Sequence, residues 1–173
     1  NAFALFTDGP RYLEPFRSLP ADFLANPIDQ FHVRPMVTYP IAASFALFGP
    51  GELAATLWTA VCSLLSVIVA YRLGFVLHGR TVGLIAALLC AFYPLEVING
   101  TRILSDVQVG LFSSVGLLLL VEASLRRNAV LYALSGAATA GAYLANGRGL
   151  LFLIALLSLL QATLTLPRLF AAS

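Results

Sequence analysis

The first 39 residues of this 173-residue sequence bring together several side chains that could bind a phosphate or move a proton. They form two clusters followed by a single tyrosine: Asp8, Arg11 and Tyr12; His32 and Arg34; and Tyr39. The guanidinium fork of an arginine matches the oxygens of a phosphate, and a carboxylate can accept a proton or hold a divalent cation. Because ionisable residues in a membrane chain are costly and usually functional, these clusters are the first candidates for a site.

The remainder of the sequence is strongly apolar. Hydrophobic residues make up 60% of the chain and charged residues only 10%, with a mean hydropathy of +0.90. A soluble domain carries about 25% charged residues, so this composition predicts an all-α, polytopic integral membrane protein. All ten basic residues are arginines, which fits a GC-rich genome and suggests a bacterial inner membrane. They are scattered, so no polybasic stripe is available for a nucleic-acid partner.

Apolar runs predict about five transmembrane helices. They cover residues 53–77, 82–98, 107–125, 129–145 and 150–166, and the fourth is rich in small residues suited to close packing: Gly136, Ala137, Ala138, Ala140 and Gly141. Another run, 36–48, would reach only about 20 Å, short of a hydrocarbon core of about 30 Å. It reads as an interfacial helix with Tyr39 at headgroup level. We therefore divide the chain into an extracytoplasmic loop with an interfacial helix (1–52) and a transmembrane helical bundle (53–173).

Five spans would place the two ends of the chain on opposite sides of the membrane. The loop 1–51, the segment 96–106 and the turn 146–149 then share one side. Arginines divide five and five between the sides, but seven of the eight acidic residues fall on the first side. The unopposed arginines of the other side indicate the cytoplasm. The N-terminal loop is thus expected to be extracytoplasmic and the C-terminus cytoplasmic.

Three separate loops bring charges of both signs to this first side. Besides the clusters of the N-terminal loop, Arg102 and Asp106 come from the segment 96–106, and Arg148 comes from the turn 146–149. A polar site at the lipid boundary with both signs suits an amphiphile that has an anionic head.

The order of these residues resembles that in the N-terminal half of the GT-C membrane glycosyltransferases. The motifs are Asp8-x-x-Arg11-Tyr12-Leu13, His32-Val33-Arg34-Pro35-x-x-x-Tyr39, Phe48-Gly49, Tyr93-Pro94 and Thr101-Arg102-Ile103-Leu104-Ser105-Asp106. The most similar groups are the protein O-mannosyltransferases and the aminoarabinose transferases. These enzymes take a sugar from a polyprenyl phosphate at the outer face of the membrane. The resemblance implies an inverting glycosyltransferase whose partners are a polyprenyl-phosphate-linked sugar and membrane lipids.

The resemblance also implies roles for single residues. Asp8 matches the general base, Asp106 an acid that shapes the catalytic site, and Arg11 and Arg34 the groups that hold the lipid phosphate. Arg102 and Arg148 are further candidates for phosphate binding, with Tyr12, His32 and Tyr39 in support. Two departures leave a divalent metal ion open as a cofactor. Val33 stands where aminoarabinose transferases have a metal-binding Glu, and Gly9 follows Asp8 where protein mannosyltransferases favour a second acid.

Each candidate also has a purely structural interpretation. Asp8 can cap a helix, and Asp106 can face the N-terminus of the helix that it opens or pair with Arg102 one turn away. Arg34 and Arg148 can contact headgroups, and the tyrosines can belong to an aromatic belt.

Two other functions compete with sugar transfer. The chain could be a catalytically inactive structural or accessory subunit of a larger membrane complex, because the resembling enzymes have more helices and a soluble C-terminal part. By this comparison the chain is expected to be a fragment or a shortened relative. A transporter ranks last, because broken helices at mid-membrane are expected there and only Pro94 interrupts a span.

Overall fold

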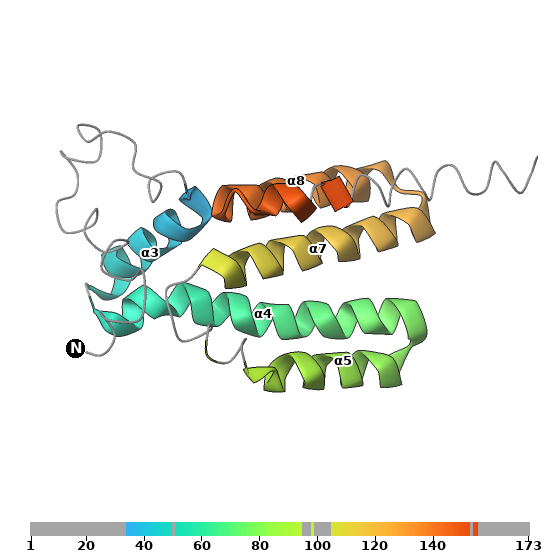
Figure 1. Ribbon diagram of the computed structural model, residues 1–173, viewed down its shortest axis with the longest axis horizontal. Coiled ribbons are helices and arrows are strands. Elements are labelled where there is room, and N and C mark those ends of the chain that lie inside the picture. Colours follow the sequence, from blue (N-terminus) through green and yellow to red (C-terminus); the bar gives the residue numbers. More distant parts are fainter. Residues whose placement is uncertain (1–33, 50, 95–97, 99–104, 153, 156–173) are drawn as a thin grey trace, which may run out of the picture.

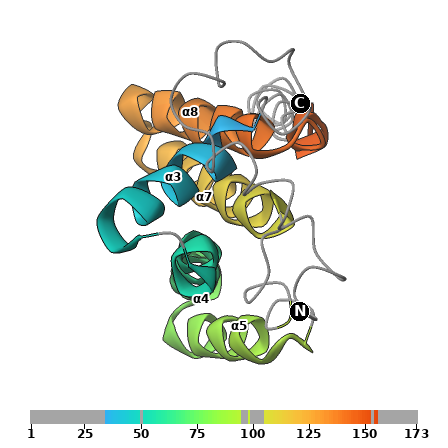
Figure 2. The same cartoon turned by 90° about the vertical axis from the view of Figure 1, so that its left-hand side faces the viewer.

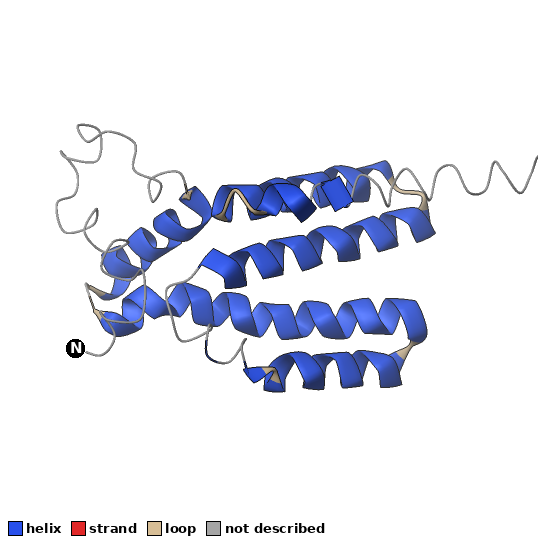
Figure 3. Ribbon diagram, viewed as in Figure 1, coloured by secondary structure: helices blue, strands red, loops and turns tan. Residues whose placement is uncertain are grey.

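The structure is a computed structural model that describes residues 34–49, 51–94, 98, 105–152 and 154–155 of the 173-residue chain. Within these residues the regular secondary structure is entirely helical, as Figure 3 shows. The all-α prediction is therefore confirmed for the described part of the chain.

Four helices lie side by side in the order α8 (Ala129–Ala145), α7 (Ser105–Arg126), α4 (Glu52–His78) and α5 (Arg80–Phe92), as Figures 1 and 2 show. The fifth, α3 (Pro35–Phe48), crosses one end of this row and contacts α4, α7 and α8. We call this the first end. The turns that join α4 to α5 and α7 to α8 form the second end, at the right in Figure 1.

Two of the described helices, α4 and α7, are long and apolar enough to cross a membrane, with 27 and 22 residues. α3, α5 and α8 are apolar but shorter, so the described residues do not confirm the predicted number of about five spans. α8 has the predicted bounds 129–145. α5 ends at Phe92, before the predicted residue 98, because Tyr93 precedes a proline and is extended, with ψ 114°.

The position of α3 depends on a proline inside it. Pro40 lacks the backbone N–H that would bond to the carbonyl of Met36 one turn earlier. The indole Nε1 of Trp58, the only tryptophan of the chain, donates to that carbonyl at 2.9 Å. The side chain of α4 thus satisfies the acceptor that Pro40 leaves open in α3, and the two helices are fixed to each other at this point.

A small apolar core lies directly beneath the first end. Val37 and Ile41 of α3 have no exposed surface. They belong to a cluster with one residue of α4, one of α7 and two of α8: Ala55, Val109, Ala142 and Ala145. Three of these four partners are alanines, so α3 can approach the row closely. Its N-terminus is thereby held over α7 and α8.

Close packing also joins the helices in pairs, through residues that periodicity alone did not single out. In α8 the buried positions facing α7 include Ser135 and Thr139, and Ser135 donates to the carbonyl of Gly116 at 2.7 Å. Of the predicted small residues, Gly141 is buried against Phe112, but Gly136, Ala137 and Ala140 are exposed. The small-residue stripe was therefore a poor guide to the packed face of α8, because small residues occur around most of this helix.

Candidate functional site

Arg34 stands immediately before α3 and reaches across to α7. Its backbone carbonyl accepts hydrogen bonds from the N–H groups of Val37 and Thr38, both at 3.0 Å, so the residue is tied to the first turn of α3. Its guanidinium Nη1 donates a long hydrogen bond of 3.4 Å to Oγ of Ser105, the first residue of α7. The phosphate-binding candidate of the N-terminal clusters is thus anchored on two helices that are 71 residues apart in sequence.

Ser105 and Asn146 complete a hydrogen-bonded group with Arg34, which we call the first-end cluster. Nδ2 of Asn146, which caps the C-terminus of α8, donates to Oγ of Ser105 at 3.0 Å. Oδ1 of Asn146 accepts the backbone N–H of Arg148 at 3.2 Å, so both ends of the amide are held. Ser105 is only 5% exposed. Three helix ends, those of α3, α7 and α8, therefore meet at one buried hydroxyl.

The two hydrogen bonds to the Ser105 hydroxyl have the same direction. Both Arg34 and Asn146 donate to it, so its oxygen accepts twice and its hydrogen is left to donate. No residue in the described part of the chain takes that hydrogen. An O–H polarised by two donors, next to a guanidinium, is suited to an acceptor oxygen that carries negative charge.

Three other predicted site residues fall in the described part. Arg148 lies in the turn after α8 and is exposed, and its backbone N–H belongs to the first-end cluster. Asp106 lies in the first turn of α7 next to Ser105, and it is also exposed. Tyr39 is 61% exposed on α3. The structure therefore brings Arg34, Asp106 and Arg148 to the same end of the bundle, but it records no contact between Asp106 and either arginine.

The remaining candidates lie outside the described residues: Asp8, Arg11, Tyr12, His32 and Arg102. Their predicted roles stay predictions. Among the residues that the structure describes, no three His, Cys, Asp or Glu side chains are grouped closely enough to hold a metal ion.

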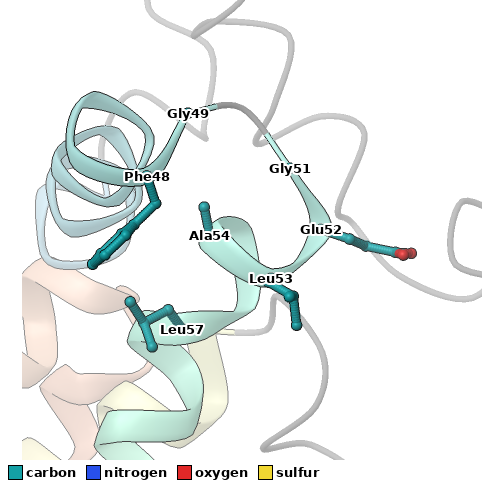
Figure 4. Close-up of a pocket in the computed structure, with 7 residues that line it drawn as sticks. All are labelled: Phe48, Gly49, Gly51, Glu52, Leu53, Ala54 and Leu57. Carbon is teal, nitrogen blue, oxygen red and sulfur yellow. The ribbon is translucent and has the colours of Figure 1, made fainter.

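A cavity of about 530 Å³ lies elsewhere, between the end of α3 and the start of α4. Figure 4 shows its lining, which is apolar except for one acid: Phe48, Gly49, Gly51, Glu52, Leu53, Ala54 and Leu57. The carboxylate of Glu52 points away from it in this view. The cavity can hold hydrocarbon but offers no cation for a phosphate. The whole of α3, about 21 Å long, separates it from Arg34, so we treat the two as different features.

Ser105 and Asn146 were not among the residues predicted from the sequence. Ser105 directly precedes Asp106 in the motif 101–106, and Asn146 opens the Asn-Gly-Arg-Gly turn that contains Arg148. Both residues therefore stand next to charged candidates in the sequence. Their own side chains are neutral, so the charge pattern did not identify them. The first-end cluster thus joins one guanidinium and one amide at a buried hydroxyl, with the exposed Arg148 beside it.

Comparison with known proteins gives one match. The family described as dolichyl-phosphate-mannose-protein mannosyltransferase matches residues 32–172, which is most of the chain. No curated protein and no solved structure matches it. The match confirms the resemblance to the GT-C membrane glycosyltransferases, and together with the apolar helices α4 and α7 it indicates an integral membrane protein. The chain belongs to the dolichyl-phosphate-mannose-protein mannosyltransferase family.

Proposed function

We propose that this protein transfers a sugar from a polyprenyl phosphate to an acceptor hydroxyl, at the first end of the helical row. The observation that carries the proposal is the first-end cluster, in which Arg34 meets Ser105 and Asn146 in a chain of this family. Arg148 lies one turn from Asn146 and adds a second guanidinium at the same end. This group is built to receive the phosphate of a lipid-linked donor.

The reaction needs a base and a group that stabilises the leaving phosphate. The acceptor oxygen attacks the anomeric carbon as its proton passes to Asp8. The bond between that carbon and the phosphate oxygen breaks, and its electron pair leaves with the polyprenyl phosphate. Arg34, Arg148 and Arg11 stabilise the growing negative charge, which is where electrostatic catalysis contributes most. Direct displacement inverts the configuration of the anomeric centre.

Asp106 and the side chains around the arginines have supporting roles. Asp106 is exposed beside Ser105, where its carboxylate can orient the acceptor or the sugar hydroxyls. Arg102 adds a further cation for the phosphate, and Tyr12, His32 and Tyr39 line the boundary between site and lipid. In this proposal the first end faces away from the cytoplasm, which is the side where the acidic residues of the sequence gather.

The proposal is tested by two variants of the full protein in a transfer assay, with binding of the polyprenyl phosphate measured in parallel. Asp8→Asn keeps the size of the side chain but cannot take a proton, so turnover should fall by about 100- to 10,000-fold while lipid binding persists. Arg34→Ala should instead weaken lipid binding, by about 1.5–3 kcal/mol for a charged hydrogen bond.

The outcomes separate the competing functions. If Asp8 only caps a helix, asparagine is nearly as good a cap, and near-normal transfer by Asp8→Asn would remove its catalytic assignment. Absence of transfer by the wild-type protein, together with a larger membrane complex that co-purifies with it, would favour an inactive accessory subunit.

A further inference from the structure

The second end of the bundle carries a group of basic residues that sugar transfer at the first end does not use. Among the described residues of this end there are four arginines, one histidine and one acid: Arg72, Arg80, Arg126, Arg127, His78 and Glu122. The single carboxylate cannot balance four guanidinium groups. This end therefore presents a net positive charge at the level where the apolar helices stop.

Two of these arginines share the one carboxylate. Nη2 of Arg72, on α4, lies 3.2 Å from Oε1 of Glu122, and Nη2 of Arg126 lies 3.3 Å from Oε2 of the same residue on α7. The Glu122 side chain is 14% exposed, whereas those of Arg72 and Arg126 are 46% and 64% exposed. The bridge thus keeps one net positive charge. Each guanidinium has five N–H donors, so donors remain for another acceptor.

The bridge lies near the end of the long apolar helix α4. Arg72 lies six residues before the end of α4, and at 1.5 Å per residue that is about 9 Å inside the helix end. Its guanidinium carbon is 5.8 Å from the ring centre of Phe75, which is within the range of a cation–π contact. The aromatic ring and the carboxylate together hold the charge of Arg72 near the end of the apolar segment.

Arg127 occupies a backbone position that disfavours it. Its φ is +49°, in the left-handed region, and it follows the last residue of α7. The N–H of Asn128 bonds back to the carbonyl of Ala123 at 3.2 Å, which is a helix-ending turn that usually has glycine or asparagine at this place. Arg127 directly follows Arg126, so a third cation stands at the same end of α7 as the bridge.

We propose that the Arg72–Glu122–Arg126 bridge, extended by Arg127, binds the phosphodiester group of an anionic phospholipid in the leaflet at the second end. The remaining N–H groups of the two bridged arginines donate to the phosphate oxygens. The guanidinium of Arg127 adds a third cation from the turn between α7 and α8. A headgroup with a net negative charge is favoured, because the bridge and Arg127 together keep two net positive charges.

The test uses the purified chain in detergent with phosphatidylcholine, titrated with phosphatidylglycerol, with the thermal midpoint as the readout. A ligand that binds only the folded state raises the midpoint, and the titration gives an apparent affinity. Phosphatidylglycerol should raise the midpoint, and added phosphatidylcholine should not. Inorganic phosphate, tested in a separate arm, should also have no effect, because it lacks the membrane anchor.

Substitutions at Arg127 separate the lipid role from a structural role. Arg127→Gly and Arg127→Asn both suit the left-handed backbone, so the midpoint without anionic lipid should stay the same or rise. Both remove a cation, so the apparent affinity for phosphatidylglycerol should fall roughly five-fold, the equivalent of about 1 kcal/mol for a basic residue near a membrane surface. Arg127→Lys keeps the charge and should stay within about two-fold of wild type.

Arg80→Gln is the positional control. It removes the same charge from the same end, but Arg80 opens α5 and forms no ion pair with Glu122 among the described residues. Its effect on affinity should be less than about two-fold. Equal affinity in wild type and Arg127→Gly would overturn the proposal, as would an Arg80→Gln loss as large as that of Arg127→Gly. An equal midpoint shift with inorganic phosphate would assign a free-anion site and overturn the lipid assignment.

Discussion

The turn that carries Asn146 and Arg148 also contains two glycines with opposite surroundings, and a matched pair of substitutions follows from them. A Cβ built on Gly149 would lie 2.5 Å from the backbone carbon of Ala142, and 2.6 Å from the oxygen of Ala142 and the nitrogen of Tyr143. A Cβ built on Gly147 would meet nothing within 4 Å. Neither glycine has a φ in the left-handed region, so alanine is acceptable to the backbone at both positions.

The expected cost of Gly149→Ala follows from these distances. Carbon atoms pack best at about 3.5–4.0 Å, so the segment after the turn must move away from α8 by about 1 Å. The atoms that it meets are backbone and cannot rotate aside. Overpacking of this kind costs about 1–3 kcal/mol. Gly147→Ala creates no contact and should be neutral or stabilising by about 0.4–1 kcal/mol, because it restricts the unfolded chain.

The assay is the thermal midpoint of each purified variant, followed by binding of the polyprenyl phosphate. At roughly 2–4 °C per kcal/mol, Gly149→Ala should melt several degrees below Gly147→Ala. Movement of the turn also displaces Asn146, which donates to Ser105, so Gly149→Ala should weaken lipid binding while Gly147→Ala should not. Equal midpoints for the two variants would refute the packing of residues 149–152 against α8. Lower stability with normal lipid binding would separate the turn from the phosphate site.

Two more predictions concern the bundle core and the orientation of the chain. Gln108 is fully buried and donates to Oγ1 of Thr59 at 3.2 Å, while its Oε1 has no partner among the described residues. Thr59→Val should therefore lower the free energy of unfolding by about 1–3 kcal/mol, because it leaves the buried amide unpaired. Adding Gln108→Leu should restore most of this loss in a denaturant titration. A double variant no more stable than Thr59→Val would contradict that reading. In a background without Cys62 and Cys90, a cysteine at position 147 should react with an impermeant thiol reagent added outside the cell. A cysteine at position 128 should not react. Labelling of both positions from one side would contradict the predicted orientation.

The sequence by itself determined the class of the protein and the location of its helices. An apolar fraction of 60% and long uninterrupted runs favour helices in a membrane, because a helix satisfies its backbone polar groups within its own segment. The runs at 53–77 and 129–145 became α4 and α8 with nearly the predicted bounds. The run 82–98 became the shorter α5, because Tyr93 before Pro94 is extended and the helix ends at Phe92. The motif order indicated the family, and the match over residues 32–172 confirmed it.

Only the tertiary structure decided which polar residues meet. Arg34 was identified from the sequence, but the serine and the asparagine that hold it lie 71 and 112 positions away and carry no charge to mark them. Likewise, helical spacing alone places Arg126 one turn from Glu122, but only the contact of α4 with α7 shows that Glu122 also pairs with Arg72. Periodicity places a residue on a face of its own helix, whereas the partner of that face depends on how helices cross. Those crossings were set by close contacts such as Trp58 with Met36, and no local pattern in the sequence encodes them.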